Sequence, residues 1–317
     1  MSKIGIDIEK AKQILHEGGL VAIPTETVYG LAANALDETA VLKIFEAKNR
    51  PHFDPLIIHT NSIENVKKHV SSFPVWAEQL ANAFWPGALT LLLPKKNTVP
   101  DLVTSGLPQV AVRIPNHPLT LQLLSNLDFP LAAPSANPFG YVSPTTAAHV
   151  AAQLQNKVDY ILDGGTCEVG IESTIVGFEN DKITVYRLGG IAIEDIEKVV
   201  GKLEVNINQS SNPQAPGMLK SHYAPLKPLF IDDINTFIKN NPTKKIGVIS
   251  FNTSYSIDKK YLKILSLSSD LKEAAHNLFA AIRELDASDA EIIVAEKFPE
   301  TFLGKAINDR LQRAATK

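Results

Sequence analysis

The chain has 317 residues, more than one hydrophobic core usually serves, so we expect two domains. An apolar fraction of 44% indicates a globular protein, and a formal net charge of −3 argues against a large nucleic-acid-binding surface. The single cysteine, Cys167, excludes an intrachain disulfide. The N-terminal stretch MSKIGIDIEKAK predicts no signal peptide, and no apolar run reaches the ~18 residues of a membrane span, so we expect a cytoplasmic location.

Short apolar runs and amphipathic stretches alternate irregularly through the first part of the chain. Asp7 is placed to cap a first helix, and Gly18-Gly19 ends it. Further helices are predicted at Glu38–Asn49, Pro118–Asn126 and Thr145–Gln155. The predicted strands are Leu20–Ile23, Leu56–His59, Leu89–Leu93, Val110–Ile114, Leu131–Ala133, Tyr160–Leu162, Ser173–Val176 and Ile183–Tyr186. This irregular alternation indicates an α/β domain with a twisted mixed sheet.

A polar stretch containing Pro and Gly, EVNINQSSNPQAPGMLKSHYAP, predicts a linker after this domain. Regular apolar runs then return, with a long helix at Leu271–Leu285. The predicted strands of this last part are Leu229–Ile231, Ile246–Phe251, Ile264–Leu267 and Ile292–Ala295. We therefore expect a first domain at 1–203, a linker or lid at 204–226 and a smaller, Rossmann-like doubly wound domain at 227–317.

Common catalytic and nucleotide motifs are incomplete in this chain. The run Gly165–Gly170 has P-loop spacing, but Ile171-Glu172 stands where Lys-Ser/Thr would meet phosphate. No GxGxxG follows a predicted strand, the eight histidines lack HExxH spacing, and no GxSxG elbow is present. Standard P-loop, dehydrogenase, zinc and hydrolase interpretations are therefore weak.

Polar side chains gather instead where predicted strands and helices end. In IPTETVYGL, two hydroxyls surround a carboxylate directly after a strand. Lys48 and Arg50 suit the C-terminus of the second helix, which is the better interpretation on position alone. Arg113 lies inside an apolar strand, where a buried ion pair and a clamp for a ligand carboxylate fit equally well.

Five further polar positions also have ordinary structural explanations. Ser135 and Asn137 suit an Asn-Pro turn, and Ser143 suits a helix N-cap, although helix N-termini also bind phosphate. Ser173 fits ordinary strand propensity, and Arg187 fits a solvated strand end. None of these positions identifies a function by itself.

The motifs are far more specific as an ordered set. PTETVYGL, KNRPHFDPLIIH, WPGALTLLL, VAVRIP, APSANPFGYVSPT, DGGTCEVGIESTIV and RLGGI together resemble the Sua5/YrdC/YwlC family over about residues 8–195. The linker APGMLKSHYAP and the tail FLGKAINDRLQRAA resemble the long Sua5 form, which has a second domain. Two departures are Asp54, where the family more often has Asn, and Lys220-Ser221 before His222.

The resemblance implies a threonylcarbamoyl-AMP synthase, a nucleotidyltransferase that serves the t6A modification of tRNA. Its substrates would be L-threonine, bicarbonate and ATP, with Mg²⁺ on the ATP phosphates and no metal site built by the protein. The product would pass to the tRNA threonylcarbamoyl-transfer machinery, and direct tRNA binding stays open. Because the reaction needs little covalent help, positioning and positive charge should supply most of the catalysis.

The same resemblance assigns roles to single residues. Thr25 is expected to support Thr27 rather than touch substrate, and Tyr223 is expected to contact the nucleotide from the linker. The implied catalytic residues are Lys48 and Arg50. The implied threonine-binding residues are Thr27, His59, Arg113, Ala133 and Ser173. The implied ATP-binding residues are Lys48, Arg50, Asp54, Gln109, Ser135, Asn137, Ser143, Arg187 and Tyr223.

Two other functions stay under consideration. A YrdC-like domain without catalysis would be an RNA-binding module, which the acidic net charge disfavours. A related carbamoyl-transfer domain occurs in hydrogenase maturation proteins, but these carry zinc-finger and acylphosphatase regions that a chain with one cysteine lacks. Pyrophosphate release that requires both threonine and bicarbonate would discriminate between these functions.

Overall fold

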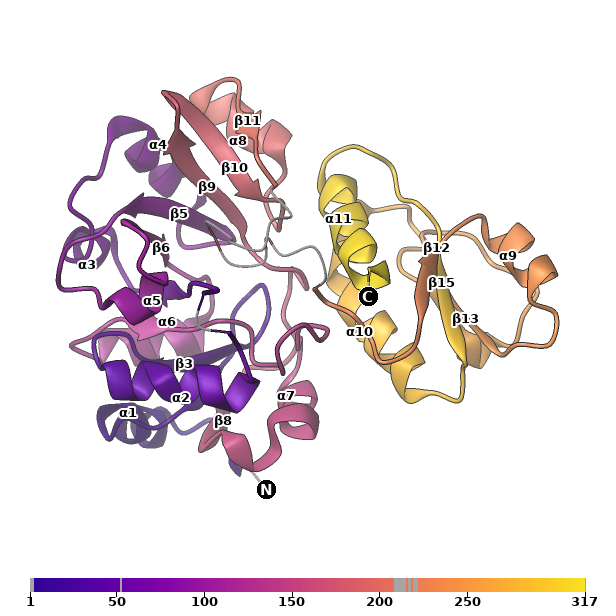
Figure 1. Cartoon of the computed structure of the whole chain (residues 1–317), viewed down its shortest axis with the longest axis horizontal. Coiled ribbons are helices and arrows are strands. Elements are labelled where there is room, and N and C mark those ends of the chain that lie inside the picture. Colours follow the sequence, from indigo (N-terminus) through magenta and orange to yellow (C-terminus); the bar gives the residue numbers. More distant parts are fainter. Residues whose placement is uncertain (1–2, 52, 208–214, 216–217, 219–221, 317) are drawn as a thin grey trace.

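The computed structural model describes residues 3–51, 53–207, 215, 218 and 222–316. These residues form two bodies, each around its own sheet, with the N-terminal body the larger (Figure 1). No helix within the described ranges is long and apolar enough to cross a membrane. The predicted α/β architecture of two domains is confirmed.

The described residues of the first body contain a mixed sheet with the strand order β1-β8-β2-β3-β7-β4-β6-β5-β9-β10-β11. Most predicted strands are present with small shifts at their ends, whereas β1, β3 and β11 were not predicted. The strands are β1 (Lys3–Gly5), β2 (Val21–Ile23), β3 (Gly30–Asn34), β4 (Ile57–His59), β5 (Leu89–Pro94), β6 (Gln109–Arg113), β7 (Leu131–Ala132), β8 (Tyr160–Leu162), β9 (Thr174–Glu179), β10 (Lys182–Arg187) and β11 (Glu204–Val205).

The helices of the first body begin and end at recognisable signals. Asp7 caps α1 by accepting a hydrogen bond from the Lys10 N–H, as predicted, and Asn49 ends α2 in the left-handed conformation. Full burial of the α2 residues Ile44 and Phe45 contributes ~1.5–3 kcal/mol each. The helices are α1 (Ile8–His16), α2 (Glu38–Lys48), α3 (Ile63–Lys67), α4 (Val75–Phe84), α5 (Asp101–Thr104), α6 (Pro118–Ser125), α7 (Ala147–Leu154), the short 3-10 turn η1 (Gln155–Lys157) and α8 (Ile193–Val200).

The second body has a parallel sheet with the order β12-β15-β13-β14 among the described residues. Helices α10 and α11 pack against each other on the side of this sheet that faces the first body (Figure 1). The elements are β12 (Leu229–Ile231), α9 (Ile234–Asn240), β13 (Ile246–Ser250), η2 (Lys259–Tyr261), β14 (Leu262–Ile264), α10 (Leu271–Ala287), β15 (Ile292–Ala295) and α11 (Leu303–Ala315). The strand predicted at Ile264–Leu267 is wrong, because pairing with β13 involves 262–264 and Leu267 is exposed.

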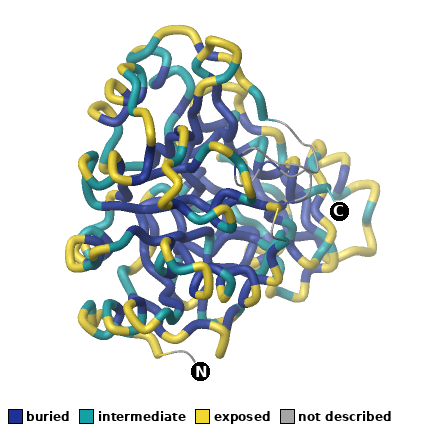
Figure 2. The backbone as a smooth tube through the Cα atoms, turned by 60° about the vertical axis from the view of Figure 1, so that its left-hand side comes forward, coloured by how far each residue is buried: buried dark blue, intermediate teal, exposed yellow. Residues whose placement is uncertain are grey.

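The two bodies share a continuous apolar core. One cluster of buried residues includes Val150 and Tyr223 together with Phe279 and Ile282 of α10. In Figure 2 the buried segments gather in the interior of the molecule, and exposed residues lie around the outside. Packing of this kind fixes α10 and α11 relative to the first sheet.

The predicted linker at 204–226 begins slightly too early, because β11 still pairs with β10. Much of the linker, including Lys220-Ser221, lies outside the described residues. Two of its described residues, Ala215 and Met218, are buried against Ile57 and Tyr186 of the first sheet. The linker therefore touches the first domain before its chain enters the second.

Candidate functional site

The site lies where several central strands of the first sheet end. His59 ends β4 and pairs in register with Arg113, which ends the parallel strand β6. Strand β5 runs antiparallel to β6 and parallel to β9. The first residues of β5 and β9 therefore lie at the same edge of the sheet as Arg113, the last residue of β6. The topology thereby brings His59, Arg113 and Ser173 together from distant parts of the chain.

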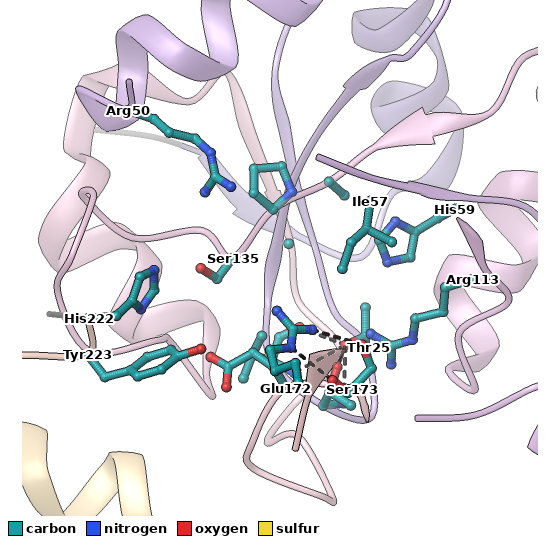
Figure 3. Close-up of a pocket in the computed structure, with 16 residues that line it drawn as sticks. Thr25, Arg50, Ile57, His59, Arg113, Ser135, Glu172, Ser173, His222 and Tyr223 are labelled. Atoms are coloured by element: carbon teal, nitrogen blue, oxygen red, sulfur yellow. Dashed lines mark hydrogen bonds between the residues drawn. The ribbon is translucent and has the colours of Figure 1, made fainter. Parts of the chain in front are cut away.

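A small pocket opens at this edge, with a free volume of about 50 Å³. Its lining comes from the first sheet and its loops and from the linker (Figure 3). Nine of the predicted site residues contribute: Thr27, Arg50, His59, Arg113, Ala133, Ser135, Ser173, Arg187 and Tyr223. A volume of this size holds a few water molecules.

The polar turn after β2 forms one wall of the pocket. The Thr25 hydroxyl donates to the Val28 carbonyl at 2.7 Å and lies 2.8 Å from the Thr27 hydroxyl. Because the Thr25 proton is used by Val28, Thr27 donates to Thr25, and the remaining lone pairs of Thr27 are free to accept from a ligand. This arrangement agrees with the supporting role expected for Thr25.

Arg113 is held by a carboxylate from the same turn. Its Nη2 lies 2.7 Å from Glu26 Oε1, and its Nε donates to the Gly87 carbonyl at 3.1 Å. The other carboxylate oxygen of Glu26 accepts from the Asn116 N–H at 2.9 Å. The interpretation as a buried ion pair is confirmed, and because Arg113 also lines the pocket, its role as a clamp for a ligand carboxylate stays a prediction.

His59 is almost fully buried beside Arg113. Burial, followed by the charge of Arg113, lowers its pKa to about 3. The ring is therefore neutral at pH 7, and its Nδ1 has no hydrogen-bond partner among the described residues. A buried polar atom of this kind, aimed at a pocket, is suited to bind a ligand.

Arg50 provides positive charge at the opposite end of the pocket. Its Nη2 lies 2.9 Å from Asp54 Oδ2 and donates to the Pro55 carbonyl at 2.8 Å. Asp54, predicted to bind nucleotide, is fully buried and does not line the pocket. In this structure Asp54 instead orients the guanidinium of Arg50.

Lys48 is buried at 1% exposure and does not extend past the helix end into solvent. Its Nζ donates to the carbonyls of Ser135 and Asn137, both at 2.5 Å. The Asn137 amide nitrogen in turn donates to the carbonyls of Pro138 and Tyr141. Lys48 thereby secures the Ser135–Asn137 loop, and burial together with the charge of Arg50 lowers its pKa.

Arg187 and Ser173 form a second buried polar group in the pocket wall. Arg187 donates from Nε to the Ser173 carbonyl and from Nη2 to the Ser173 hydroxyl, at 3.0 and 3.1 Å. The same hydroxyl lies 2.7 Å from that of Thr90. The interpretation of Arg187 as a solvated strand end is wrong, because the side chain is 5% exposed; burial lowers its pKa to about 10, so it stays charged at pH 7.

Ser143 does not cap α7, because the cap is Thr146. The Ser143 hydroxyl donates to Glu172 Oε1 at 2.5 Å. The second oxygen of Glu172 accepts from Arg310 Nε at 2.8 Å, and Arg310 belongs to α11 of the second domain. Ser143 was also considered as part of a helix N-terminus that binds phosphate. Its hydroxyl is used by Glu172 and it does not begin α7, so the structure gives this alternative no support.

The linker places two aromatic rings over the pocket. Tyr223 is buried with φ of 63°, and its ring lies 4.1 Å from that of His222 between centroids. Figure 3 shows the Tyr223 hydroxyl pointing toward the Glu172 carboxylate. Neither the Tyr223 hydroxyl nor His222 Nδ1 has a hydrogen-bond partner among the described residues. Both groups are available to a ligand.

Gln109 is not brought to the pocket. It begins β6, whereas Arg113 ends the same strand, so the two residues reach opposite edges of the sheet. Its register partner is Pro94 at the far end of β5. The assignment of Gln109 to ATP binding receives no support from this geometry.

Two residues important in the structure were not predicted: Glu26 and Glu172. Glu26 was visible within IPTETVYGL, but nothing local to the sequence shows that its partner is Arg113. In the sequence, Glu172 stands out only because it occupies a position where a P-loop would have Ser or Thr. Both residues are isolated acidic residues within apolar segments, and this pattern could have identified them. A carboxylate in such a segment is buried on folding and then requires a partner.

The charges in the lining favour an anionic ligand. Arg50, Arg113 and Arg187 surround the pocket, while both carboxylates near it are already paired. Val28, Ile57 and Ala133 add apolar surface to the lining. Within the described residues, no group of three or more His, Cys, Asp or Glu is placed to hold a metal ion. The arrangement suits a small molecule with carboxylate and phosphate groups and an apolar part.

Comparison with known proteins agrees with this geometry. Residues 13–189 match the family model Sua5_yciO_yrdC, described as "Telomere recombination", and residues 191–316 match Sua5_C, described as "Threonylcarbamoyl-AMP synthase, C-terminal domain". Threonylcarbamoyl-AMP synthases of Pyrococcus abyssi and Bacillus subtilis are 42% and 41% identical; each alignment covers 97% of this chain, and 94% and 92% of the relatives.

A solved structure gives the same result for the whole chain. The P. abyssi Sua5 protein complexed with L-threonine superposes with a TM-score of 0.92 at 40% identity, covering 99% of this chain and 97% of that one. Both domains are therefore shared with this relative. This chain belongs to the Sua5/YciO/YrdC family, in the form that carries the Sua5 C-terminal domain.

Proposed function

We propose that this protein is a threonylcarbamoyl-AMP synthase, which converts L-threonine, bicarbonate and ATP to threonylcarbamoyl-AMP and pyrophosphate. The observation that carries the proposal is the two-ended pocket. One end offers Thr27, His59 and Arg113 to an amino acid, and the opposite end offers Arg50 to phosphates, with Arg187 as a further cation in the wall beside Ser173. Membership of the family and the threonine complex of a relative support the same reaction.

Arg113 would bind the threonine carboxylate. Glu26 and Gly87 hold two of its guanidinium nitrogens, which leaves its remaining N–H groups in a fixed direction for a bidentate contact. Thr27 would accept from the amino acid, and the neutral His59 ring would bind without adding charge. The threonine methyl would rest against Val28, Ile57 or Ala133.

The chemistry requires two bonds to form in sequence. The threonine amine attacks bicarbonate carbon to give a carbamate with loss of water, and a carbamate oxygen then attacks the α-phosphate of ATP with pyrophosphate leaving. Arg50 and Arg187 would stabilise the charge that develops on phosphate in a partly desolvated site. Because the carbamate is labile, the closed cover formed by His222 and Tyr223 would exclude water.

Magnesium would enter with ATP. Mg²⁺ commonly binds through substrate phosphates and keeps several waters, so it needs few protein ligands. The cationic lining and the already paired carboxylates fit a metal that the phosphates hold. The product would pass to proteins that transfer the threonylcarbamoyl group to tRNA, and the proposed location is the cytoplasm, where both ATP and tRNA are present.

Purified protein with Mg²⁺ and ATP should release pyrophosphate only when threonine and bicarbonate are both added. Serine should support a roughly 10-fold lower rate, since one lost methyl in an apolar pocket costs ~1–3 kcal/mol. Equal release without an amino acid would refute the proposal. Binding of structured RNA without any such release would instead support the RNA-binding module.

A further inference from the structure

Arg310 of α11 is a fully buried guanidinium that crosses from the second domain to the first. Its exposure is 0%, and it makes three directed contacts. Nε donates to Glu172 Oε2 at 2.8 Å, and Nη2 donates to the Leu188 carbonyl at 2.7 Å. Nη1 donates to Asp309 Oδ2 of its own helix at 2.7 Å, so the fork is held from both sides.

Two of these contacts end on the wall of the pocket. Glu172 lines the pocket and also accepts the Ser143 hydroxyl, so its carboxylate is fixed by one group from each domain. Leu188 directly follows Arg187, whose side chain lines the pocket. Arg310 therefore restrains the pocket wall beside Arg187 and the one acidic side chain that the described pocket lining contains.

Besides its three hydrogen bonds, Arg310 makes a cation–π contact with Tyr223. The guanidinium carbon lies 4.9 Å from the centre of the Tyr223 ring, and the Phe279 ring of α10 is stacked on the same tyrosine at 5.5 Å. The backbone of Tyr223 has φ of 63°, which a large side chain rarely adopts unless its surroundings hold it. Here the surroundings come mainly from the second domain.

We propose that Arg310 is a positioning residue for the nucleotide half of the active site, acting through Glu172, the Leu188 carbonyl and the Tyr223 ring. The inference rests on the proposed function for the identity of the ligand. It assigns the second domain a direct part in the geometry of the pocket, although Arg310 itself touches no substrate. The nucleotide contact expected of Tyr223 in the linker thereby comes to depend on α11 as well.

A simple role in holding the domains together is the competing explanation, and the interface offers a control for it. Lys305 of the same helix forms an interdomain ion pair with Glu194 at 2.7 Å and does not line the pocket. Lys305→Met therefore removes a contact between the domains without disturbing Glu172 or Tyr223. If interdomain contact alone mattered, Lys305→Met would change the same binding constants as the Arg310 variants, to a smaller extent.

The test compares Lys305→Met and two Arg310 variants of the full chain with the wild type. Arg310→Lys keeps the charge but loses the fork, and Arg310→Met combined with Glu172→Gln removes both charges so that neither is left buried without its partner. Titration calorimetry measures the Kd for Mg²⁺ with a non-reacting α,β-methylene analogue of ATP and, separately, the Kd for L-threonine. Circular dichroism checks that each variant is folded.

We expect the Kd for the analogue to rise at least 10-fold in the double variant and about threefold in Arg310→Lys, with threonine binding within twofold of the wild type. Lys305→Met should leave both constants within twofold. Unchanged analogue binding in the folded Arg310 variants would overturn the proposal, and so would a parallel loss of both ligands. Failure of the proposed function is separate, because it would show as wild-type protein that releases no threonine-dependent pyrophosphate.

Discussion

The two ends of the pocket are built in different ways. The end proposed for threonine consists of the turn after β2, the ends of β4 and β6, and Ser173 just before β9, all within the first domain. The nucleotide end combines Arg50 after α2, Arg187 at the end of β10, and His222 and Tyr223 of the linker, which α10 and α11 hold in place. We infer that the first end is assembled when the first domain folds, whereas the second depends on how the domains pack.

The largest effect is expected at the threonine end. Arg113→Lys should raise the KM for threonine about 1,000-fold, since breaking a desolvated charge pair costs ~2–5 kcal/mol and lysine cannot reproduce the fork. The Kd for the ATP analogue should stay near the wild-type value, because Arg113 lies at the other end. Steady-state kinetics and calorimetry measure the two quantities. A variant with normal threonine KM would place the amino acid elsewhere.

At the nucleotide end, Arg50→Met should lower kcat about 100-fold, since one electrostatic contact to the transition state is typically worth ~3 kcal/mol. Combined with Asp54→Asn, so that Asp54 is not left buried as an unpaired charge, this change should alter the melting temperature little in comparison. Lys48→Met should also lose activity, but with a clear loss of stability, because Lys48 secures the carbonyls of Ser135 and Asn137. Comparable melting temperatures for both variants would contradict the assignment of Arg50 to catalysis and of Lys48 to stability. Near-normal turnover in both variants would support the interpretation that the two cations only complement the C-terminus of α2.

Acid should weaken the fold through the threonine end. The pKa of His59 is about 3 in the folded protein and ~6.5 when unfolded, so the unfolded chain binds more protons as pH falls below 6.5. Stability is therefore lost between about pH 6.5 and 3, by ~2 kcal/mol per such histidine between pH 7 and 5. Urea unfolding of His59→Gln should show a shallower loss than the wild type. The exposed His16→Gln is the control, and equal slopes in all three proteins would exclude His59 as a cause.

The smallest effect is expected from Tyr223→Phe. The change keeps the stacked ring and the left-handed backbone position but removes a hydroxyl that has no partner among the described residues. If that hydroxyl binds nucleotide, the Kd for the ATP analogue should rise about fivefold, since a net hydrogen bond contributes ~1 kcal/mol. Tyr223→Ala should cost more, because the pocket cover itself is lost. Identical affinity in wild type and Tyr223→Phe would show that Tyr223 serves only as packing.

Much of the first domain follows from local sequence. The apolar runs of 20–23 and 110–114 and the cap at Asp7 predict their elements because period, burial and capping are short-range properties. Strand β3 (Gly30–Asn34) was missed, since GLAAN lacks the β-branched residues typical of strands. A Cβ at Gly30 would lie 3.2 Å from that of Ala133, closer than an ordinary contact, so glycine fits there without a shift of Ala133.

The sequence by itself determined the order of the elements, the family and, through the family resemblance, most of the residues proposed for the threonine end, because its motifs are contiguous in the chain. Only the tertiary structure decided that Gln109 lies at the opposite edge, that Glu26 holds Arg113, and that Arg310 reaches Glu172. The last pair is separated by 138 residues in the chain. A buried ion pair of this kind depends on how two independently patterned domains pack, and no local property of either segment specifies its partner.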